Sequence, residues 1–397
     1  MDDKASLTDV NNWNLPDSRL VLAKLKKDIP TASKSLWILD DSLSPLNLYC
    51  YLKARFGSPN GFAMTLRDNS TDNLIQYHYT LQAGDRIIDI FGKNTQVEFV
   101  LESSVPLVSE DWKRLSSSIR DDLKNYGSQL KEIRSKLDKY RLFVNPYKRI
   151  AKIVERFEKR LRELHINSIS PPANPRSPAE VQAFATEFQN CIDTYVEASA
   201  LATSLKMIAP VMAEAFINLL LFVLRRAEIK ADDRLYDSIF RLQIDVRTKG
   251  LSLYCYEFDK PIDASDQRFK DFHTLMNQRN DLLHGNVDPQ KYGLGDVFFD
   301  DNIFIGNETQ GFSDRALLNL TKYVEPKSAL DDIETIRAFV DFVLGHLKPG
   351  ISESIKMVMN CDQPGWDASD KHVAVLFPEH LAESFIFNEH DMKSLAD

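Results

Sequence analysis

The sequence predicts a mainly α-helical protein with a small α+β domain at its N-terminus, and three observations support this class. Glycine and proline are sparse, with 14 and 17 among 397 residues, which favours helices. Residues 61–103 contain β-branched and aromatic segments separated by short turn sequences, as in an antiparallel sheet. From residue 109 onward, apolar residues recur mainly at helical spacing. The length and the apolar content of 43% are sufficient for two or three domains.

Residues 1–108 are expected to form the α+β domain, with a sensory or regulatory role. Ser44 and Pro45 open a short helix as N-cap and first helical residue, and the sequence GSPNG ends it. Four segments then follow in which apolar and polar residues partly alternate, and we predict a four-stranded antiparallel meander from them. These segments are FAMTLRD, NLIQYHYTLQ, RIIDIFG and QVEFVLES.

Residues 109–166 contain two predicted helices that we expect to pair as an exposed basic hairpin. The first begins at a Ser109 cap with an acidic first turn, and Asn145-Pro146 separates it from the second. Residues 113–162 contain 16 lysines or arginines against 6 acidic residues, whereas residues 171–397 contain 22 against 36. This asymmetry indicates a surface for a polyanion, an attraction between domains, or a solvated helix face.

Residues 167–178, NSISPPANPRSP, are predicted to be a linker, because proline and serine dominate them. A helical bundle is expected over residues 179–397. Its first helix starts at a capping box and runs to Ile208, and Pro210 begins the next helix. Further helices are expected over residues 233–249, 266–283 and 328–347. Two strand-like pieces, DVFFDD and NIFIG, predict a short β insertion near residues 286–312.

Cysteine usage and hydropathy favour a soluble cytoplasmic protein without a membrane span. The four cysteines include no C-x-x-C pair, so neither a zinc knuckle nor a disulfide framework is indicated. The acidic and polar start MDDKASLTDVNNW is unlike a signal peptide. The most apolar run, residues 217–224, is much shorter than the roughly 20 residues of a spanning helix. Zinc-binding histidine spacings are absent too, and we expect no metal and no other cofactor.

The segment that could carry chemistry is QRNDLLHGN, residues 278–286, where polar residues surround two leucines. An arginine and a histidine with four residues between them occur three times, so this spacing alone does not choose a site. The three pairs are Arg160–His165, Arg268–His273 and Arg279–His284. Only the last lies where a predicted helix ends. On a continuous helix its two side chains point about 140° apart. They converge only if the helix unwinds near Leu283 or if a second copy supplies the partner.

The sequence RNDLLHG resembles the R-N-x-x-x-H signature of the HEPN superfamily of helical ribonucleases, over about residues 175–350. The resemblance implies a HEPN-like bundle of four or so helices that dimerises and brings two motifs to one cleft. It also implies metal-independent endonuclease activity on RNA, in which the 2′-hydroxyl attacks the adjacent phosphate. The products would be a 2′,3′-cyclic phosphate and a 5′-hydroxyl.

Within this resemblance, Arg279, Asn280 and His284 are the catalytic candidates. A histidine can take or give a proton near neutral pH. An arginine stays charged and suits the extra negative charge of a phosphorane-like transition state. Asn280 would orient the phosphate or the imidazole, and Asp281 would hold a ring nitrogen of His284.

Glu214 is a supporting candidate, because it is a single acid in an otherwise apolar helix, with Asn218 one turn later. An unpaired buried carboxylate is costly, so Glu214 needs a partner if it is buried. HEPN-like proteins often brace the motif arginine with an acid from a neighbouring helix, which leads us to expect a Glu214–Arg279 pair. In the alternative, Glu214 lies at the edge of the bundle and faces water.

The resemblance implies an endoribonuclease effector of prokaryotic antiviral defence, abortive infection or toxin–antitoxin growth arrest. Its partners would be RNA, with tRNA among the candidates, a second copy in a homodimer, and a regulatory ligand, phage component or antitoxin. Four basic residues would hold the RNA backbone, namely Lys148, Arg149, Lys152 and Arg156. Three alternatives stay open. The polar cluster could only cap a helix end, the chain could be a non-catalytic helical dimer that binds other proteins, or the nuclease could depend on metal.

Overall fold

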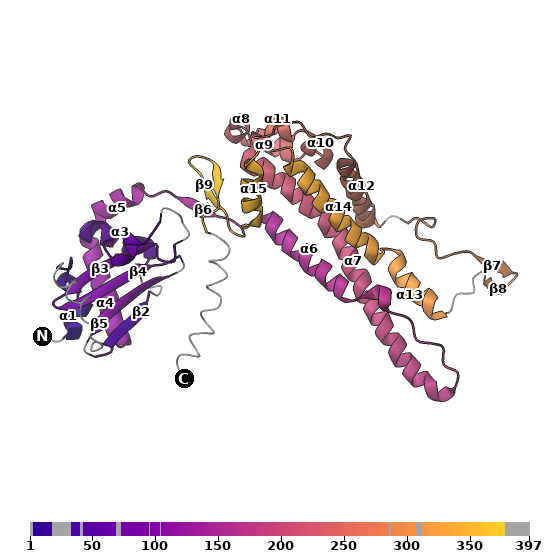
Figure 1. Cartoon of the computed structure of the whole chain (residues 1–397), viewed down its shortest axis with the longest axis horizontal. Coiled ribbons are helices and arrows are strands. Elements are labelled where there is room, and N and C mark those ends of the chain that lie inside the picture. The colour runs from indigo at the N-terminus through magenta and orange to yellow at the C-terminus, as the bar shows by residue number, and fades with distance from the viewer. Residues whose placement is uncertain are drawn as a thin grey trace. The chain divides into compact units, whose positions relative to one another are not determined.

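The computed structural model describes residues 3–17, 33–39, 43–68, 73–94, 96–103, 105–285, 287–306 and 312–377. These residues form two compact units, an N-terminal unit that reaches Lys139 and a C-terminal unit, Tyr140–Val375 (Figure 1). Helices predominate, and an antiparallel sheet lies in the N-terminal unit. The predicted mainly α class is therefore confirmed.

The N-terminal unit contains a five-stranded antiparallel sheet with the strand order β1-β3-β4-β5-β2. The strands are β1 (Trp13–Asn14), β2 (Ser33–Ile38), β3 (Tyr77–Ala83), β4 (Arg86–Gly92) and β5 (Val97–Ser103). β3, β4 and β5 come from the predicted meander, and every second residue of β5 is buried, as the period of a strand requires. The expected first strand, FAMTLRD, is wrong, because its start forms the 3-10 helix η2 (Phe62–Thr65).

Helices pack against this sheet and extend the unit beyond the expected boundary at residue 108. They are α1 (Asp3–Thr8), α3 (Pro45–Phe56), α4 (Ser109–Leu123) and α5 (Gly127–Ser135), with the 3-10 helices η1 (Val10–Asn12) and η3 (Lys124–Tyr126). Leu115 and Ile119 of α4 are buried in the same apolar cluster as Tyr79 and Phe99 of the sheet. α4 is therefore part of this core, which places the end of the unit near Lys139.

The expected basic hairpin of residues 109–166 is also wrong. α4 and α5 belong to the N-terminal unit, whereas α6 (Pro146–Glu163) belongs to the C-terminal unit and buries Val154 and Leu161 there. Each amphipathic helix thus buries its apolar face in a different core. Residues 167–178, expected to be a linker between domains, instead connect two helices of the C-terminal unit.

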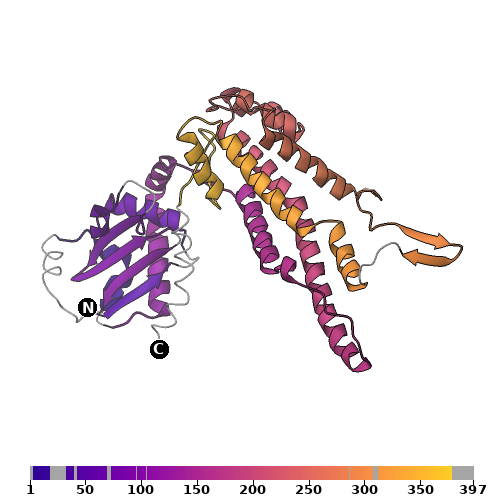
Figure 2. The same cartoon turned by 45° about the vertical axis from the view of Figure 1, so that its right-hand side comes forward.

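The C-terminal unit is built around α7 (Val181–Leu224), a helix of 44 residues. Four other helices pack against it, namely α6, α12 (Gln267–His284), α13 (Phe312–Lys322) and α14 (Pro326–Leu344) (Figures 1 and 2). Pro210, expected to separate two helices, lies buried inside this continuous helix. A proline removes one backbone hydrogen bond, and packing on several sides offsets that loss.

Short helices complete the bundle. They are α8 (Ala227–Ala231), α9 (Asp233–Phe240), α10 (Ile244–Lys249), α11 (Leu251–Tyr254) and α15 (Ile351–Asn360), with the 3-10 helices η4 (Ile166–Ser168) and η5 (Pro178–Glu180). Residues 233–249, expected to be one helix, are therefore two. The centre of the core contains Phe272 of α12 stacked on Phe339 of α14, with ring centroids 3.9 Å apart.

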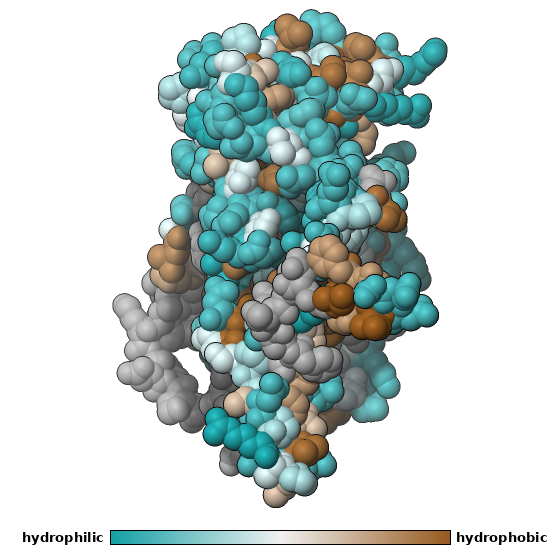
Figure 3. Space-filling model, turned by 90° about the vertical axis from the view of Figure 1, so that its right-hand side faces the viewer, coloured by the Kyte–Doolittle hydropathy of each residue, from teal (hydrophilic) through white to brown (hydrophobic). Residues whose placement is uncertain are grey.

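Two small sheets belong to the C-terminal unit. One consists of β6 (Tyr140–Leu142), β9 (Gly365–Asp367) and β10 (His372–Ala374). The other is a hairpin of β7 (Val297–Asp300) and β8 (Ile303–Gly306), in the range where the sequence predicts a β insertion. Figure 2 shows that this hairpin projects beyond the helices. Its apolar side chains are exposed, and Figure 3, drawn from that side, shows hydrophobic residues gathered on the surface.

In the part of the chain that the structure describes, one helix is long and apolar enough to cross a membrane by length and composition, the segment Pro178–Leu224 that contains α7. The apolar run at residues 217–224 is thus part of a much longer helix than expected. Half of its most apolar window is buried inside the C-terminal unit. Such burial is typical of a core helix in a soluble protein.

Candidate active site

The R-N-x-x-x-H motif occupies the last turns of α12. The Asp266 side chain caps the start of this helix by accepting a hydrogen bond from the backbone N–H of Arg268. Gly285 ends it in the left-handed conformation, with φ of 60°, as the sequence predicts. The helix continues through His284 and does not unwind near Leu283. The first of the two ways to bring Arg279 and His284 together is therefore excluded.

Arg279 and His284 lie on different faces of α12. Five residues of a continuous helix correspond to about 500°, which leaves the two side chains about 140° apart. The Arg279 side chain is half-buried and lines a pocket, whereas His284 is exposed and does not line it. One copy of the chain does not bring the guanidinium and the imidazole together.

The Arg279 pocket lies between α7, α12, α13, α14 and the segment after the motif, and has a volume of about 230 Å³. Four cationic side chains and two acidic ones line it: Lys206, Arg279, Lys291, Lys322, Glu325 and Asp332. The excess of positive charge suits an anion such as a phosphate. The Nε atom of Arg279 is buried, and it has no hydrogen-bond partner among the described residues.

One ion pair crosses this pocket. Lys206 of α7 donates to Oδ2 of Asp332 of α14 over 2.7 Å. Burial raises the pKa of Asp332 above its usual value, and the hydrogen bond from Lys206 opposes this shift only in part. Two aromatic rings, Tyr292 and Tyr323, lie beside the cations with centroids 4.9 Å apart. The pocket therefore combines positive charge with flat apolar surface.

The other motif residues are exposed on the solvent side of α12. Asn280 accepts a hydrogen bond from Nη1 of Arg279 over 3.3 Å, so its amide is next to the guanidinium. Asp281 is exposed as well. Leu283 follows with an exposed fraction of 52%, and Val287, just beyond the helix, with 92%. These two apolar side chains are therefore accessible at the surface beside the motif.

Glu214 does not pair with Arg279, and this expectation is wrong. Its Oε1 atom accepts from Nη2 of Arg247, on α10, over 3.4 Å. Arg247 is buried and also donates to Oδ1 of Asn218 and to the Leu242 carbonyl. The charge of Glu214 is thus balanced by an arginine that the sequence analysis did not consider.

The four basic candidates lie together on α6, in the same unit as the motif. Lys152 forms an ion pair with Asp362 at 2.6 Å, and Lys148 donates to Oδ1 of Asn360 over 3.4 Å. Arg149 and Arg156 are exposed. Part of this basic face is therefore used in contacts within the unit, and the two arginines remain the more accessible cations.

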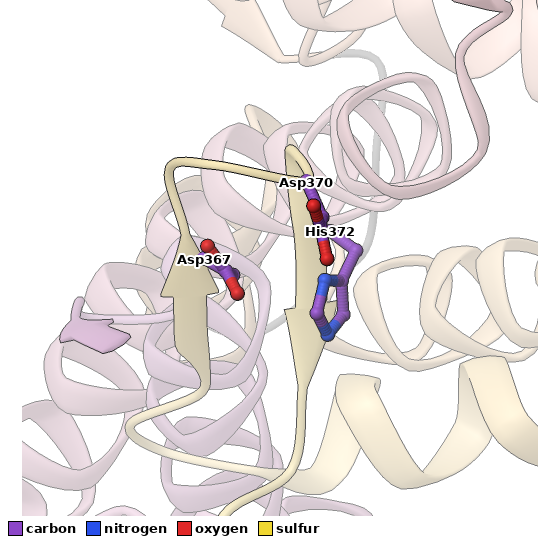
Figure 4. Close-up of side chains that lie close together, drawn as sticks. All are labelled: Asp367, Asp370 and His372. Carbon is purple, nitrogen blue, oxygen red and sulfur yellow. The ribbon is translucent and has the colours of Figure 1, made fainter. Parts of the chain in front are cut away.

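Asp367, Asp370 and His372 form a cluster whose possible ligand atoms lie within 4.8 Å of one another (Figure 4). They surround the turn between β9 and β10. Asp367 accepts hydrogen bonds from the hydroxyl and the backbone N–H of Ser369, and these bonds lower its pKa. The arrangement serves to close the turn, and it does not by itself indicate a metal site. Sequence reasoning missed the cluster because its spacing matches no metal-binding motif.

No family model matches the chain, and no curated protein or solved structure matches it either.

Proposed function

We propose that the C-terminal unit is a metal-independent HEPN-type endoribonuclease that works as a homodimer. The proposal rests on the R-N-x-x-x-H motif at the exposed end of α12 and on the placement of Arg279. This arginine lines a cationic pocket with a buried Nε that has no partner among the described residues. A guanidinium at the wall of a cationic pocket is suited to an acceptor such as a phosphate oxygen.

The directions of the two side chains favour a two-copy site. Arg279 and His284 diverge on one helix, so each would meet its counterpart across a two-fold axis. The exposed Leu283 and Val287 at the same helix end supply apolar surface for that contact. In such a cleft, the guanidinium of Arg279 would face His284 of the partner subunit across the scissile phosphate.

The chemistry of this cleft is proton transfer and charge stabilisation. An imidazole takes the proton of the 2′-hydroxyl, whose oxygen attacks the adjacent phosphorus. The bond from phosphorus to the 5′-oxygen breaks, and the imidazolium returns its proton to that leaving oxygen. The guanidinium stabilises the added negative charge on the phosphate oxygens. Asn280, next to the guanidinium, orients the phosphate. Arg149 and Arg156 of α6 are the accessible cations that would hold the RNA backbone.

The biological role in this proposal is that of a cytoplasmic effector in prokaryotic antiviral defence or growth arrest. Its substrate is RNA, with tRNA among the candidates. The N-terminal unit would serve as the sensor or regulator, responding to a ligand, a phage component or an antitoxin. This part of the proposal depends on the family resemblance of the motif.

Incubation of the full chain with tRNA and with total RNA in EDTA tests the activity. We expect cleavage to persist in EDTA and to fall about 10²–10⁴-fold in Arg279→Ala and His284→Ala. Arg268→Ala and His273→Ala are matched controls, because this pair has the same spacing on the same helix. Cleavage that EDTA abolishes would indicate a metal-dependent nuclease. Equal cleavage by all variants would refute the assigned site.

A second candidate function is a non-catalytic dimer that binds other proteins. The observation that favours it is the β7–β8 hairpin, which comes after the motif helix in the chain and exposes apolar residues. Under this alternative, wild type and all four variants would be equally inert towards RNA. They would also be equally harmless when expressed in bacteria.

A further inference from the structure

A second pocket, distinct from the Arg279 pocket, lies between α6, α7 and α9 of the C-terminal unit. Its volume is about 470 Å³, and Phe143, Phe222 and Phe240 are among its aromatic walls. Small-molecule sites typically have this size, apolar walls and a few convergent polar groups. None of the motif residues lines it, so it can be considered without reference to RNA cleavage.

Glu214 and Asn218 supply a carboxylate and an amide to this lining, one helical turn apart on the same face of α7. Arg247 has an exposed fraction of 5% and holds both of them. A guanidinium only donates hydrogen bonds, so Asn218 must present Oδ1 to Arg247, which leaves its Nδ2 as a donor. Among the described residues, Oε2 of Glu214 has no hydrogen-bond partner and remains an acceptor.

The charge of this site selects a neutral ligand. The Glu214 carboxylate is balanced by the Arg247 guanidinium at 3.4 Å, so the pocket carries no net charge from this pair. A cationic ligand would gain the attraction of Glu214 but would also meet the repulsion of Arg247. An anionic ligand would be attracted by Arg247 but repelled by Glu214. Apolar aromatic walls further disfavour an ion without a partner of its own.

The shape of the hydrogen-bonding edge selects a chemical class. An acceptor and a donor that lie one turn apart complement a ligand that offers an N–H and a C=O on one edge. Phenylalanine side chains on the surrounding walls favour a planar ring. We infer that this pocket binds a neutral, planar ligand with a cis-amide edge, such as the lactam of a nucleobase or an aromatic primary carboxamide. Glu214 accepts from its N–H, and Asn218 donates to its carbonyl.

Paired probes test the edge directly, with the full chain and calorimetric or thermal-shift detection. The probes are inosine against 1-methylinosine, and benzamide against N,N-dimethylbenzamide, because methylation removes the N–H donor that Glu214 accepts. We expect at least one unmethylated probe to bind, and its methylated partner to bind at least about tenfold more weakly. Benzamidine, a cation of similar shape, should bind no more tightly than benzamide. Absence of binding by both unmethylated probes at millimolar concentration overturns the inference, as does equal binding of the methylated ones.

Two variants locate the binding. Asn218→Asp keeps an acceptor for Arg247 and removes the amide donor, so we expect binding at least about tenfold weaker without loss of the fold. Ala215→Phe fills the pocket from the same face of α7 and should abolish binding. Glu187→Gln, at an exposed position of α7, is the control and should bind as wild type does. Unchanged binding by Asn218→Asp would place the ligand elsewhere. Because the readout is binding, these results are independent of whether the chain cleaves RNA.

Discussion

Arg337 of α14 donates a hydrogen bond from Nη2 to Oε2 of Glu158 on α6, with 2.6 Å between the two atoms. Arg162, one turn after Glu158, donates to Oε1 of the same carboxylate over 2.8 Å. Glu158 is buried, while both guanidinium groups are about half exposed. Burial alone would raise the pKa of Glu158, but the bonds from Arg337 and Arg162 outweigh it and hold this pKa below its usual value.

This arrangement predicts a pH-dependent loss of stability in Glu158→Gln. A carboxyl group with a lowered pKa stabilises the fold above its unfolded-state pKa, and the effect disappears as the pH falls through the folded-state pKa. At pH 7 we expect the free energy of unfolding of the variant to be about 1–2 kcal/mol lower than that of wild type. The loss is modest because the two arginine partners are half exposed. The difference in unfolding free energy between wild type and variant should become smaller as the pH falls below 4.5, the usual pKa of a glutamate. Urea titrations across this range provide the measurement, with exposed Glu155→Gln as control. A difference that stays constant down to pH 3 would contradict the assignment.

Phe272→Ala is expected to be among the more destabilising changes in α12. Phe272 is fully buried and stacks on Phe339 of α14, so its removal leaves a cavity between the motif helix and the bundle. Such truncations cost about 3–5 kcal/mol. Thermal and urea unfolding would measure the loss, and Phe62→Ala, at an exposed position of the N-terminal unit, should cost much less. A loss below about 1 kcal/mol would mean that α12 is not anchored by this stack.

Local signals in the sequence were sufficient to predict several individual helices and strands. The end of α12 was predicted because Gly285 adopts a left-handed conformation that glycine favours, and β3 to β5 were predicted from their alternation. β2 was missed because it has apolar residues on both faces. Ser35 and Trp37 of this strand are buried, whereas Leu36 and Ile38 are exposed. An apolar pattern does not reveal the buried face of such a strand.

Choices between distant partners were not predictable from the sequence. Glu214 was expected beside Arg279, yet the fold places Arg247 next to it, and no spacing distinguishes the two arginines in advance. The same reason explains why α4 and α6 were expected to pair. Both are amphipathic, and which core each one joins depends on the packing of the whole chain. Pro210 inside α7 shows that packing also overrides a strong local break signal.

The β7–β8 hairpin is predicted to lie in the interface of the proposed homodimer. Phe299 and Phe304 are opposite each other on one face, with exposed fractions of 64% and 57%. A two-stranded hairpin is marginally stable alone, so a covering partner would stabilise it. Asp296, Asp300 and Asp301 would repel RNA or an anionic membrane, which favours a protein partner. The hairpin also comes after the motif helix in the chain. A two-copy site requires that helix to lie near the interface.

The double variant Phe299→Asp/Phe304→Asp tests this placement. We expect it to shift the chain from dimer to monomer in light scattering after size exclusion, since two charges would be buried without partners. The midpoint of thermal unfolding at low protein concentration should change little, because both residues lie outside the apolar core. Leu253→Asp, an equally exposed apolar position on α11, is the control and should remain dimeric. A dimer that survives the double variant would place the interface elsewhere.

The two-copy site makes a prediction that a single-chain site does not share. If Arg279 acts with His284 of the partner subunit, a heterodimer of Arg279→Ala and His284→Ala chains contains one site with both residues intact. Unfolding and refolding an equimolar mixture makes about half of the dimers mixed, each with one of two sites restored. The mixture should therefore recover about a quarter of wild-type cleavage, although each variant alone is inactive.

Mixing Arg279→Ala with Arg279→Ala/His284→Ala is the matched control, because no pairing of these chains restores a complete site. Wild type taken through the same refolding gives the reference rate. Recovery confined to the complementary pair would place the guanidinium and the imidazole in different copies, as their 140° divergence on α12 requires. Different affinity tags on the two variants, recovered together in sequential purification, must show that mixed dimers form. If they form and no activity returns, while wild type regains its own, the two groups do not act across a two-fold axis and the proposed cleft is refuted.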